Sequence, residues 1–211
     1  DTARKRGKTE TVLAAFSRGD AQILLGTQLV TKGFHFPGVT LVGVINADIM
    51  LNLPDFRSSE RTFQIITQVA GRSGRGPIPG RVLIQTYHPD QYSIICSQLQ
   101  DFPKFYAEEV PLRRELRFPP FSRLILLRIK GTDEKTVWRE ARSIAAAVKP
   151  LHGVQLFGPN RSFYYRVRKQ YRVFVLLKIP KTYQHNRLKF LRARKIRGCT
   201  LEIDVDPMET F

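Results

Sequence analysis

The order of apolar runs in the second half of the chain limits its possible folds more than any other feature. Alternation and β-branched residues predict strands at 122–131, 154–159, 171–179 and 200–207. Helical patterns at 133–150, with the first turn near Thr132 or Asp133, and at 182–196 separate them. The order strand, helix, strand, strand, helix, strand is typical of an α+β, ferredoxin-like antiparallel sheet with two helices on one face.

The first half has a different pattern, which predicts an α/β unit. Short apolar runs at 21–27, 40–48 and 81–87 suit strands buried in a parallel sheet, and 58–68 is predicted to be a helix between two of them. A further helix is expected to end near Gly19.

Pro119-Pro120 marks the domain boundary that we expect, because proline stretches restrict the preceding backbone. Residues 91–116 have a helical pattern, with Pro103 as a candidate break. The predicted domains are therefore 1–90, a helical connector at 91–118, and a basic domain at 119–211.

Charge indicates the class of partner. The formal net charge is +17, and residues 131–211 hold 17 basic and 7 acidic residues. So basic a domain most often binds a phosphate backbone, where neutralised phosphates release counterions. Ribosomal or membrane-surface association is the competing interpretation, and charge alone does not separate them.

The segment 160–172 mixes cations with aromatic rings and is the predicted DNA-binding surface of the basic domain. Cations hold phosphates while rings stack on unpaired bases, which favours single strands or a fork. Of the tyrosines we expect Tyr171 and one of Tyr164 and Tyr165 to face the core. The candidate DNA-binding residues are Arg161, Arg166, Arg168, Lys169, Tyr171 and Arg172. The cations of the second predicted helix, Lys189, Arg192, Arg194, Lys195 and Arg197, belong to the same footprint or form a solvated face.

The segment 68–75 reads Gln-Val-Ala-Gly-Arg-Ser-Gly-Arg. Arg72 and Arg75 lie three apart among small residues, a spacing that suits two guanidinium groups aimed at a polyanion such as a γ-phosphate. Upstream, Gly33 allows close backbone approach to a phosphate.

The segments 26–48 and 68–75 resemble motifs V and VI, respectively, of superfamily 2 helicases, which lie in the second RecA-like lobe. Four blocks, at 32–48, 55–76, 117–124 and 201–207, are similar in wording and order to the replication-restart DNA helicases of that superfamily. The resemblance covers nearly the whole chain and implies a partial RecA-like lobe followed by the small C-terminal domain.

The resemblance also implies residue roles. Arg72 and Arg75 would be catalytic γ-phosphate ligands. The ATP-binding set is Gln68, Gly71, Arg72, Arg75, Lys32 and Gly33, and Thr27 and Gln28 would contact DNA. His35 stands where many relatives have a ribose-binding Asp, and it binds ribose or donates to a backbone carbonyl. Asp48 is a helix N-cap or a motif residue.

The implied function is that of an ATP-dependent 3′→5′ DNA helicase of the bacterial cytoplasm, associated with the nucleoid. It recognises stalled or branched forks and starts primosome assembly, with DNA, primosome proteins and single-strand-binding protein as partners. ATP and Mg²⁺ would bind mainly in a first lobe, and zinc elsewhere in the intact protein. Because the chain begins at Asp1 without Met, we expect a fragment. The family carries its Walker A lysine and acidic Mg²⁺ motif upstream of this point, so we expect the fragment to bind DNA without ATPase activity. The alternatives are a non-enzymatic nucleic-acid-binding module and a different superfamily 2 helicase.

Cys96 and Cys199 are too far apart to predict a disulfide framework or a metal knuckle, and we expect both to be buried in a reducing compartment. The four histidines stand apart, so no metal site is predicted. No apolar run reaches the roughly 20 residues of a membrane span.

Overall fold

Two separate sheets organise the computed structural model, which describes residues 6–27, 36, 38–71, 80–194 and 196–210. The chain divides into two compact units. Unit 1 comprises Asp1–Asn52 and Ser59–Phe102, and unit 2 comprises Leu53–Ser58 and Pro103–Phe211.

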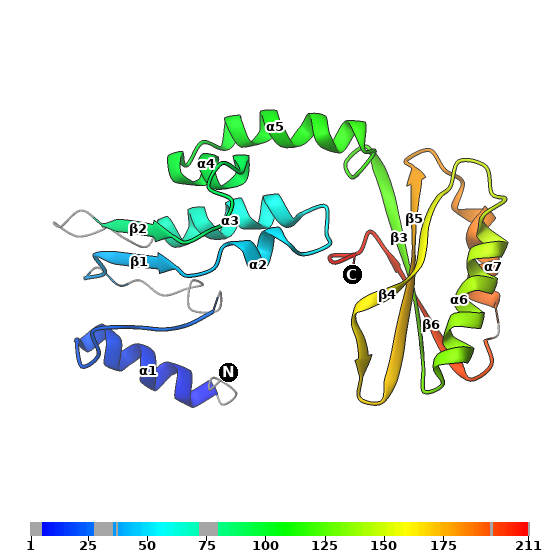
Figure 1. Ribbon diagram of the computed structural model, residues 1–211, viewed down its shortest axis with the longest axis horizontal. Coiled ribbons are helices and arrows are strands. Elements are labelled where there is room, and N and C mark those ends of the chain that lie inside the picture. Colours follow the sequence, from blue (N-terminus) through cyan, green and yellow to red (C-terminus); the bar gives the residue numbers. More distant parts are fainter. Residues whose placement is uncertain (1–5, 28–35, 37, 72–79, 195, 211) are drawn as a thin grey trace. The chain divides into compact units, whose positions relative to one another are not determined.

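Unit 1 contains a parallel pair of strands, as predicted. β1 (Leu41–Val44) pairs in register with β2 (Arg81–Ile84), and the connection between them runs through α2 (Asp48–Leu51) and α3 (Ser58–Ala70) (Figure 1). A parallel pair requires such a crossover, because its strands cannot be joined by a tight hairpin. Ala47, Ile66 and Ile94 form the buried core beside this pair.

The strand predicted at 21–27 is wrong. This segment has no strand pairing, and the side chains of Ile23 and Leu25 are 78% and 80% exposed. An apolar run becomes a buried strand only where neighbouring strands supply hydrogen bonds and helices cover it, and β1 and β2 pair only with each other in the described sheet. The preceding helix, α1 (Arg6–Arg18), ends at Gly19 with φ +84°, as expected of a glycine after a helix.

The helical pattern of 91–116 corresponds to two helices, α4 (Tyr92–Leu99) and α5 (Phe102–Glu115). The break lies at Gln100, which has φ +51°, and Pro103 does not make it. A proline in the first turn of a helix forfeits no hydrogen bond, so Pro103 fits there. Pro111 lies inside α5 and removes one hydrogen bond of the helix.

Unit 2 confirms the predicted order of strands and helices. Its elements are β3 (Ser122–Gly131), α6 (Glu134–Val148), β4 (Gln155–Val167), β5 (Gln170–Pro180), the 3₁₀ turn η2 (His185–Leu188), α7 (Lys189–Ala193) and β6 (Cys199–Val205). All pairings are antiparallel, in the spatial order β4-β5-β3-β6. β4 runs eight residues beyond its predicted end at 159, whereas α7 is shorter than the predicted helix.

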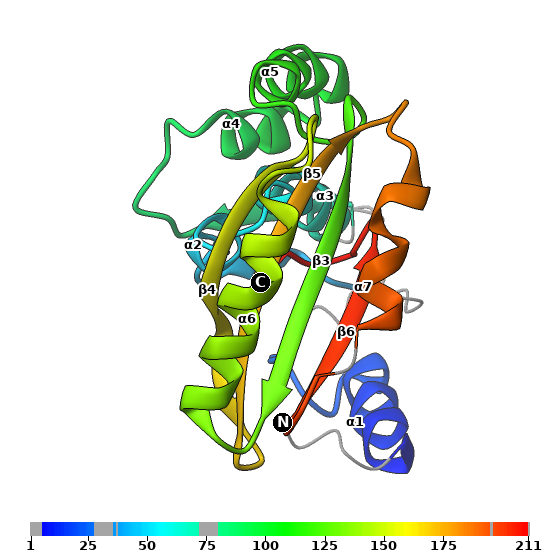
Figure 2. The same ribbon diagram turned by 90° about the vertical axis from the view of Figure 1, so that its right-hand side faces the viewer.

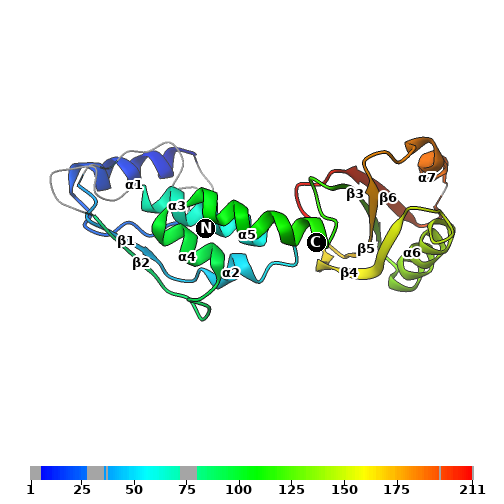
Figure 3. The same cartoon turned by 90° about the horizontal axis from the view of Figure 1, so that it is seen from above.

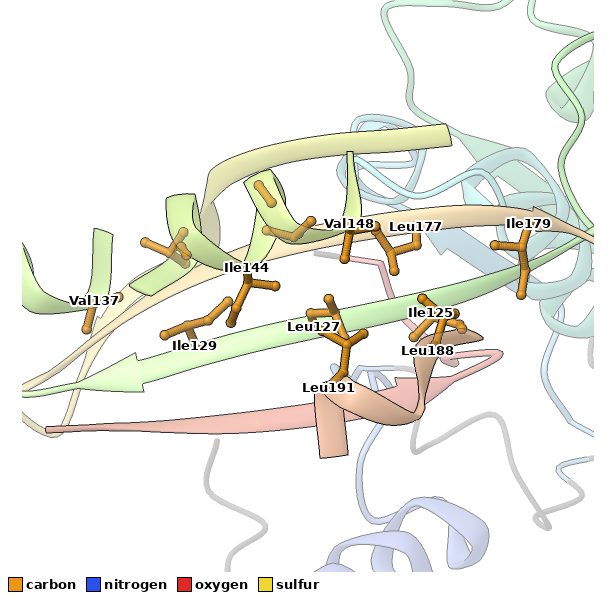
Figure 4. Packing of buried hydrophobic residues seen from close by; sticks show 14 of the residues in the cluster. Ile125, Leu127, Ile129, Val137, Ile144, Val148, Leu177, Ile179, Leu188 and Leu191 are labelled. Atoms are coloured by element: carbon orange, nitrogen blue, oxygen red, sulfur yellow. The ribbon is translucent and has the colours of Figure 1, made fainter. Parts of the chain in front are cut away.

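One face of this sheet is packed against both helices (Figures 2 and 3). Alternate residues of β3 and β5 meet the apolar side of α6, as Figure 4 shows for Ile129, Leu127 and Ile144. Val137, Val148, Leu177 and Leu191 are also fully enclosed or nearly so. Burying each such aliphatic side chain contributes about 1.5–3 kcal/mol, so this layer is the main core of unit 2.

The opposite face is covered at one end by the segment 53–58 and the turn that follows α5. Phe56 stacks on Phe118 with ring centroids 5.0 Å apart, and both pack against Leu124 and Leu126. Lys178 is buried next to this ring pair. Its Nζ lies 3.8 Å from the centroid of the Phe118 ring and donates a hydrogen bond to the backbone carbonyl of Leu116 at 2.7 Å. Burial, with the nearby charge of Arg117, lowers the pKa of Lys178.

Hydrogen bonds tie the segment 53–58 to the last described residues. The buried Asp55 carboxylate accepts from the backbone N–H of Thr210 at 3.0 Å. Arg57 donates to the carbonyl of Pro207 at 3.0 Å. The segment therefore belongs to unit 2 although it connects two helices of unit 1.

The cysteines differ in their surroundings. Cys96 is fully buried, as predicted, but Cys199 is only partly buried, because it starts the edge strand β6. Burial raises the pKa of the Cys199 thiol, and the charge of Glu140 adds to this. None of the helices in the described ranges is long and apolar enough to cross a membrane.

Gly131 lies at the end of β3, where close packing leaves no room for a side chain. A Cβ there would lie 2.9 Å from Cγ2 of Val137 and 3.0 Å from Sγ of Cys199, so Gly131→Ala overpacks the site. We predict a loss of about 1–3 kcal/mol in the free energy of unfolding, measured by urea denaturation. Gly43→Ala, where a Cβ meets nothing within 4 Å, is the control, and equal effects of the two changes would contradict this packing.

Candidate nucleic-acid interface

The hairpin of β4 and β5 presents two cations at its tip. Val167 pairs with Gln170, so Arg168 and Lys169 form the two-residue turn between the strands. Both have positive φ, 49° and 65°, as in the two-residue turns that match the twist of a hairpin. Both side chains are exposed, and their charges are therefore available to an anion.

Two aromatic side chains are exposed beside this tip. The β4–β5 register shifts between Arg161 and Arg166, and Phe163 and Tyr164 lie in that irregular stretch with 53% and 63% of their surface exposed. Their rings meet edge to face with centroids 5.1 Å apart. Exposed rings among cations can stack on unpaired bases.

Two further tyrosines face the packed side of the sheet, as predicted for Tyr171 and one of the pair 164 and 165. Tyr165 and Tyr171 contact each other edge to face and pack against the core. The hydroxyl of Tyr165 accepts from Trp138 Nε1 at 2.9 Å and donates to Glu134 at 2.5 Å. Burial raises the pKa of this hydroxyl, and its hydrogen bond to Glu134 raises it further.

The rings of Tyr165 and Tyr171 make cation–π contacts with two of the predicted arginines, Arg161 and Arg166. The Arg161 guanidinium carbon lies 4.6 Å from the centroid of Tyr165, and that of Arg166 lies 5.1 Å from the centroid of Tyr171. A cation over a ring is attracted by its π electrons and loses side-chain freedom. The structure thus orders both guanidinium groups before any ligand binds.

Arg172 lies on the other face of the sheet from the tyrosine-held Arg161 and Arg166. It stands on the sheet face without helices, and its Nε is buried without a hydrogen bond in the described part of the chain. Of the cations in the second predicted helix, Arg194 follows α7 and donates to Ser143 on α6 at 2.5 Å, and Lys195 lies outside the described residues.

In unit 1 the structure describes only part of the predicted site. Gln68 is exposed near the end of α3, Gly71 follows that helix with its N–H bonded to Thr67 at 3.0 Å, and Thr27 is exposed. The other predicted residues lie outside the described ranges: Gln28, Lys32, Gly33, His35, Arg72 and Arg75.

Asp48 joins the carboxyl ends of β1 and β2. It is buried at the start of α2, which is capped by Ala47, so the N-cap alternative is wrong. Its carboxylate accepts from Thr86 Oγ1 at 2.8 Å and from the N–H of Tyr87 at 3.1 Å. Burial acts to raise the pKa of Asp48, but these hydrogen bonds and the nearby His88 outweigh it and hold the pKa below its ordinary value.

Within the described ranges no three His, Cys, Asp or Glu side chains gather as they would to hold a metal ion. The chemistry that this arrangement offers is the recognition of phosphates and bases.

Sequence reasoning missed Lys130 as a neighbour of Arg172. The strand pattern of 122–131 places Arg128 and Lys130 on one face, but the pairing of that strand with β5 was needed to bring them to Arg172.

Known proteins are similar in sequence to this chain. Residues 114–208 match the family model described as Primosomal protein N C-terminal domain. The Replication restart protein PriA of Synechocystis sp. is 41% identical over 99% of this chain, and that of Bacillus subtilis is 39% identical over 98%. The protein of the same name from Rickettsia prowazekii is 38% identical over the whole chain. This chain belongs to the PriA family. It spans 25%, 27% and 33% of the length of these three PriA relatives, respectively.

The PriA family model covers the whole four-stranded sheet of unit 2, from the end of α5 to the tail after β6. The hairpin with its cations and aromatic rings therefore lies within the matched PriA domain, and not in a segment peculiar to this chain.

The hairpin tip is tested by the double change Arg168→Gln and Lys169→Gln. Removing two phosphate contacts should lower the magnitude of the slope of log affinity against log salt by about 1.4 for a single-stranded oligonucleotide. Fluorescence anisotropy titrations over a salt series measure this slope. Lys135→Gln and Lys149→Gln on the exposed side of α6 form the matched control, and equal slopes for the two double variants would contradict the site.

Proposed function

We propose that this chain is the C-terminal part of a PriA-type, ATP-dependent 3′→5′ DNA helicase, in which unit 2 holds DNA. The intact protein would recognise stalled or branched replication forks and initiate primosome assembly. The observation that carries the proposal is the β4–β5 hairpin, which carries four exposed cations, Arg161, Arg166, Arg168 and Lys169, and two exposed aromatic rings, Phe163 and Tyr164. The named relatives, which are replication restart proteins, support the biological setting.

The chemistry of the hairpin favours single-stranded regions. Guanidinium groups bind phosphate oxygens through several N–H donors, and Arg161 and Arg166 are already ordered over tyrosine rings. Rings such as Phe163 and Tyr164 need the open face of a base, which a paired duplex keeps stacked. A fork offers such unpaired segments.

Unit 1 would be the distal part of a RecA-like second lobe. A parallel strand pair crossed by helices fits this arrangement, and the exposed Ile23 and Leu25 suit a segment that further strands of an intact lobe would cover. Arg72 and Arg75 would then reach the γ-phosphate of ATP, assisted by Gln68 at the end of α3 and by Gly71.

The remaining cofactor residues would belong to other parts of the intact protein. ATP and Mg²⁺ would be held mainly by a first lobe, and zinc by a separate cysteine cluster. Primosome proteins and single-strand-binding protein are the partners we propose, in the bacterial cytoplasm near the nucleoid. A non-enzymatic DNA-binding module is the second candidate, favoured by the small two-stranded sheet of unit 1.

The ATP role is tested in two steps. The chain alone should bind single-stranded DNA without DNA-stimulated ATP hydrolysis, because the groups that hold ATP and Mg²⁺ are proposed to lie mainly in a first lobe. In a full-length protein that contains this chain, Arg75→Ala should lower ATP turnover by about 10³-fold or more and leave DNA affinity unchanged. Phosphate release assays measure the turnover, with the exposed Arg81, changed to Ala, as control.

Turnover that survives Arg75→Ala would remove this arginine from the ATP site and favour the binding module. Hydrolysis by the isolated chain would contradict the division of the site between two lobes.

A further inference from the structure

The face of the four-stranded sheet without helices has a cationic centre. The β3–β5 register sets Lys130 opposite Arg172, and Arg128 opposite Phe174. Their neighbours Ile129 and Val173 point to the helices on the other face, and successive side chains of a strand alternate between faces. Arg128, Lys130 and Arg172 therefore share the helix-free face, next to the hairpin tip.

The proximity of these three cations is unfavourable in the protein without a bound ligand. Like charges directly opposite each other on neighbouring strands destabilise the pair, and the Nε of Arg172 is buried without a hydrogen bond in the described structure. Two carboxylates of the edge strand β6 offset part of the cost. Lys130 forms an ion pair with Glu202, and Arg128 contacts Asp204 at 3.3 Å. Three cations thus share two carboxylates.

Two aromatic rings continue the same face toward β4. Phe157 pairs with Leu176, and Phe174 packs with that residue on the helix-free side. Phe157 is 44% exposed. Across the sheet the side chains therefore change from acidic on β6, through basic on β3 and β5, to aromatic on β5 and β4.

We infer that this face, from Lys130 and Arg172 to Phe157, binds a segment of single-stranded DNA that continues from the hairpin tip. The inference rests on the proposed DNA-binding function and extends it to a surface on the other side of the sheet from the tyrosine-held arginines. The phosphates contact Arg172 and Lys130, and unpaired bases stack on Phe174 and Phe157. Four-stranded sheets with aromatic side chains are used in this way to stack bases.

Glu202 acts as the internal competitor of the phosphate. Its hydrogen bond from Lys130 lowers its pKa, against an opposing effect of burial, and the carboxylate is therefore ionised at neutral pH. In the free protein it neutralises Lys130, and a phosphate must displace it. The surface consequently gains affinity when this carboxylate is removed, which a merely structural ion pair does not predict.

Two opposite charge changes test the inference, with binding of labelled oligothymidylate to the chain as the readout. Lys130→Gln should lower the affinity about three- to tenfold and reduce the magnitude of the salt slope by about 0.7. Glu202→Gln should raise the affinity about threefold or more. The matched controls are Lys149→Gln on α6 and Glu108→Gln on α5, both exposed, which change the net charge equally at other places.

A third variant tests the rings. Phe157→Leu keeps an apolar side chain but removes the stacking surface, and we expect a loss of about fivefold for a single strand and none for a blunt duplex. Thermal unfolding by circular dichroism checks that each variant is folded.

The outcomes separate the two proposals. If both charge variants match their controls while the hairpin-tip variant loses binding, the helix-free face is not part of the site and the proposed function stands. Weaker binding by Glu202→Gln would also overturn the inference, since the carboxylate would then support the site. If the unchanged chain does not bind oligothymidylate, the proposed DNA-binding function itself fails.

Discussion

The structure of unit 2 depends on one-sided burial of its sheet. Aliphatic side chains from β3 and β5 meet α6 and α7 on one face, and this layer supplies the apolar burial that orders four antiparallel strands. Because both helices lie on that face, the other face is free to carry charge. The segment 53–58 and the turn after α5 cover one end of it, and its cations lie at the end near the hairpin tip.

The same packing orders the groups proposed to bind DNA. Tyr165 is fixed by hydrogen bonds to Trp138 and Glu134, and its ring in turn holds Arg161. An arginine that is already ordered loses less freedom when it meets a phosphate. Phe163 and Tyr164 are exposed at the irregular part of β4. The hairpin thus combines ordered charges with accessible rings.

Periodicity was sufficient to predict the order of elements in unit 2 and the parallel pair in unit 1, because alternation and apolar runs report directly on burial. Periodicity failed where pairing with neighbouring strands decides whether a segment forms a strand and how long that strand is. Residues 21–27 are apolar enough for a strand, but they have no paired neighbour in the described sheet. The length of β4 was missed because its second half is polar and aromatic, and pairing with β5 extends it.

The candidate site was predictable in part. The mixture of cations and rings at 160–172 predicted the candidate DNA-binding surface, and the packing of Tyr171 against the core was expected from the need to fill it. The proximity of Lys130 and Arg172 was not predictable, since strand register depends on the whole sheet. The role of Asp48 was also hidden, because Thr86 is 38 residues away in sequence. The roles of Arg72 and Arg75 stay predictions, as both lie outside the described residues.

The central claim is that the hairpin end of the four-stranded sheet holds single-stranded DNA. Ultraviolet cross-linking of oligothymidylate to this chain, followed by mass spectrometry of the peptides, tests it most directly. We expect adducts on the exposed rings of Phe163 and Tyr164, and their loss when both are changed to Leu. Adducts confined to α7 or to unit 1, with none between residues 160 and 172, would contradict it.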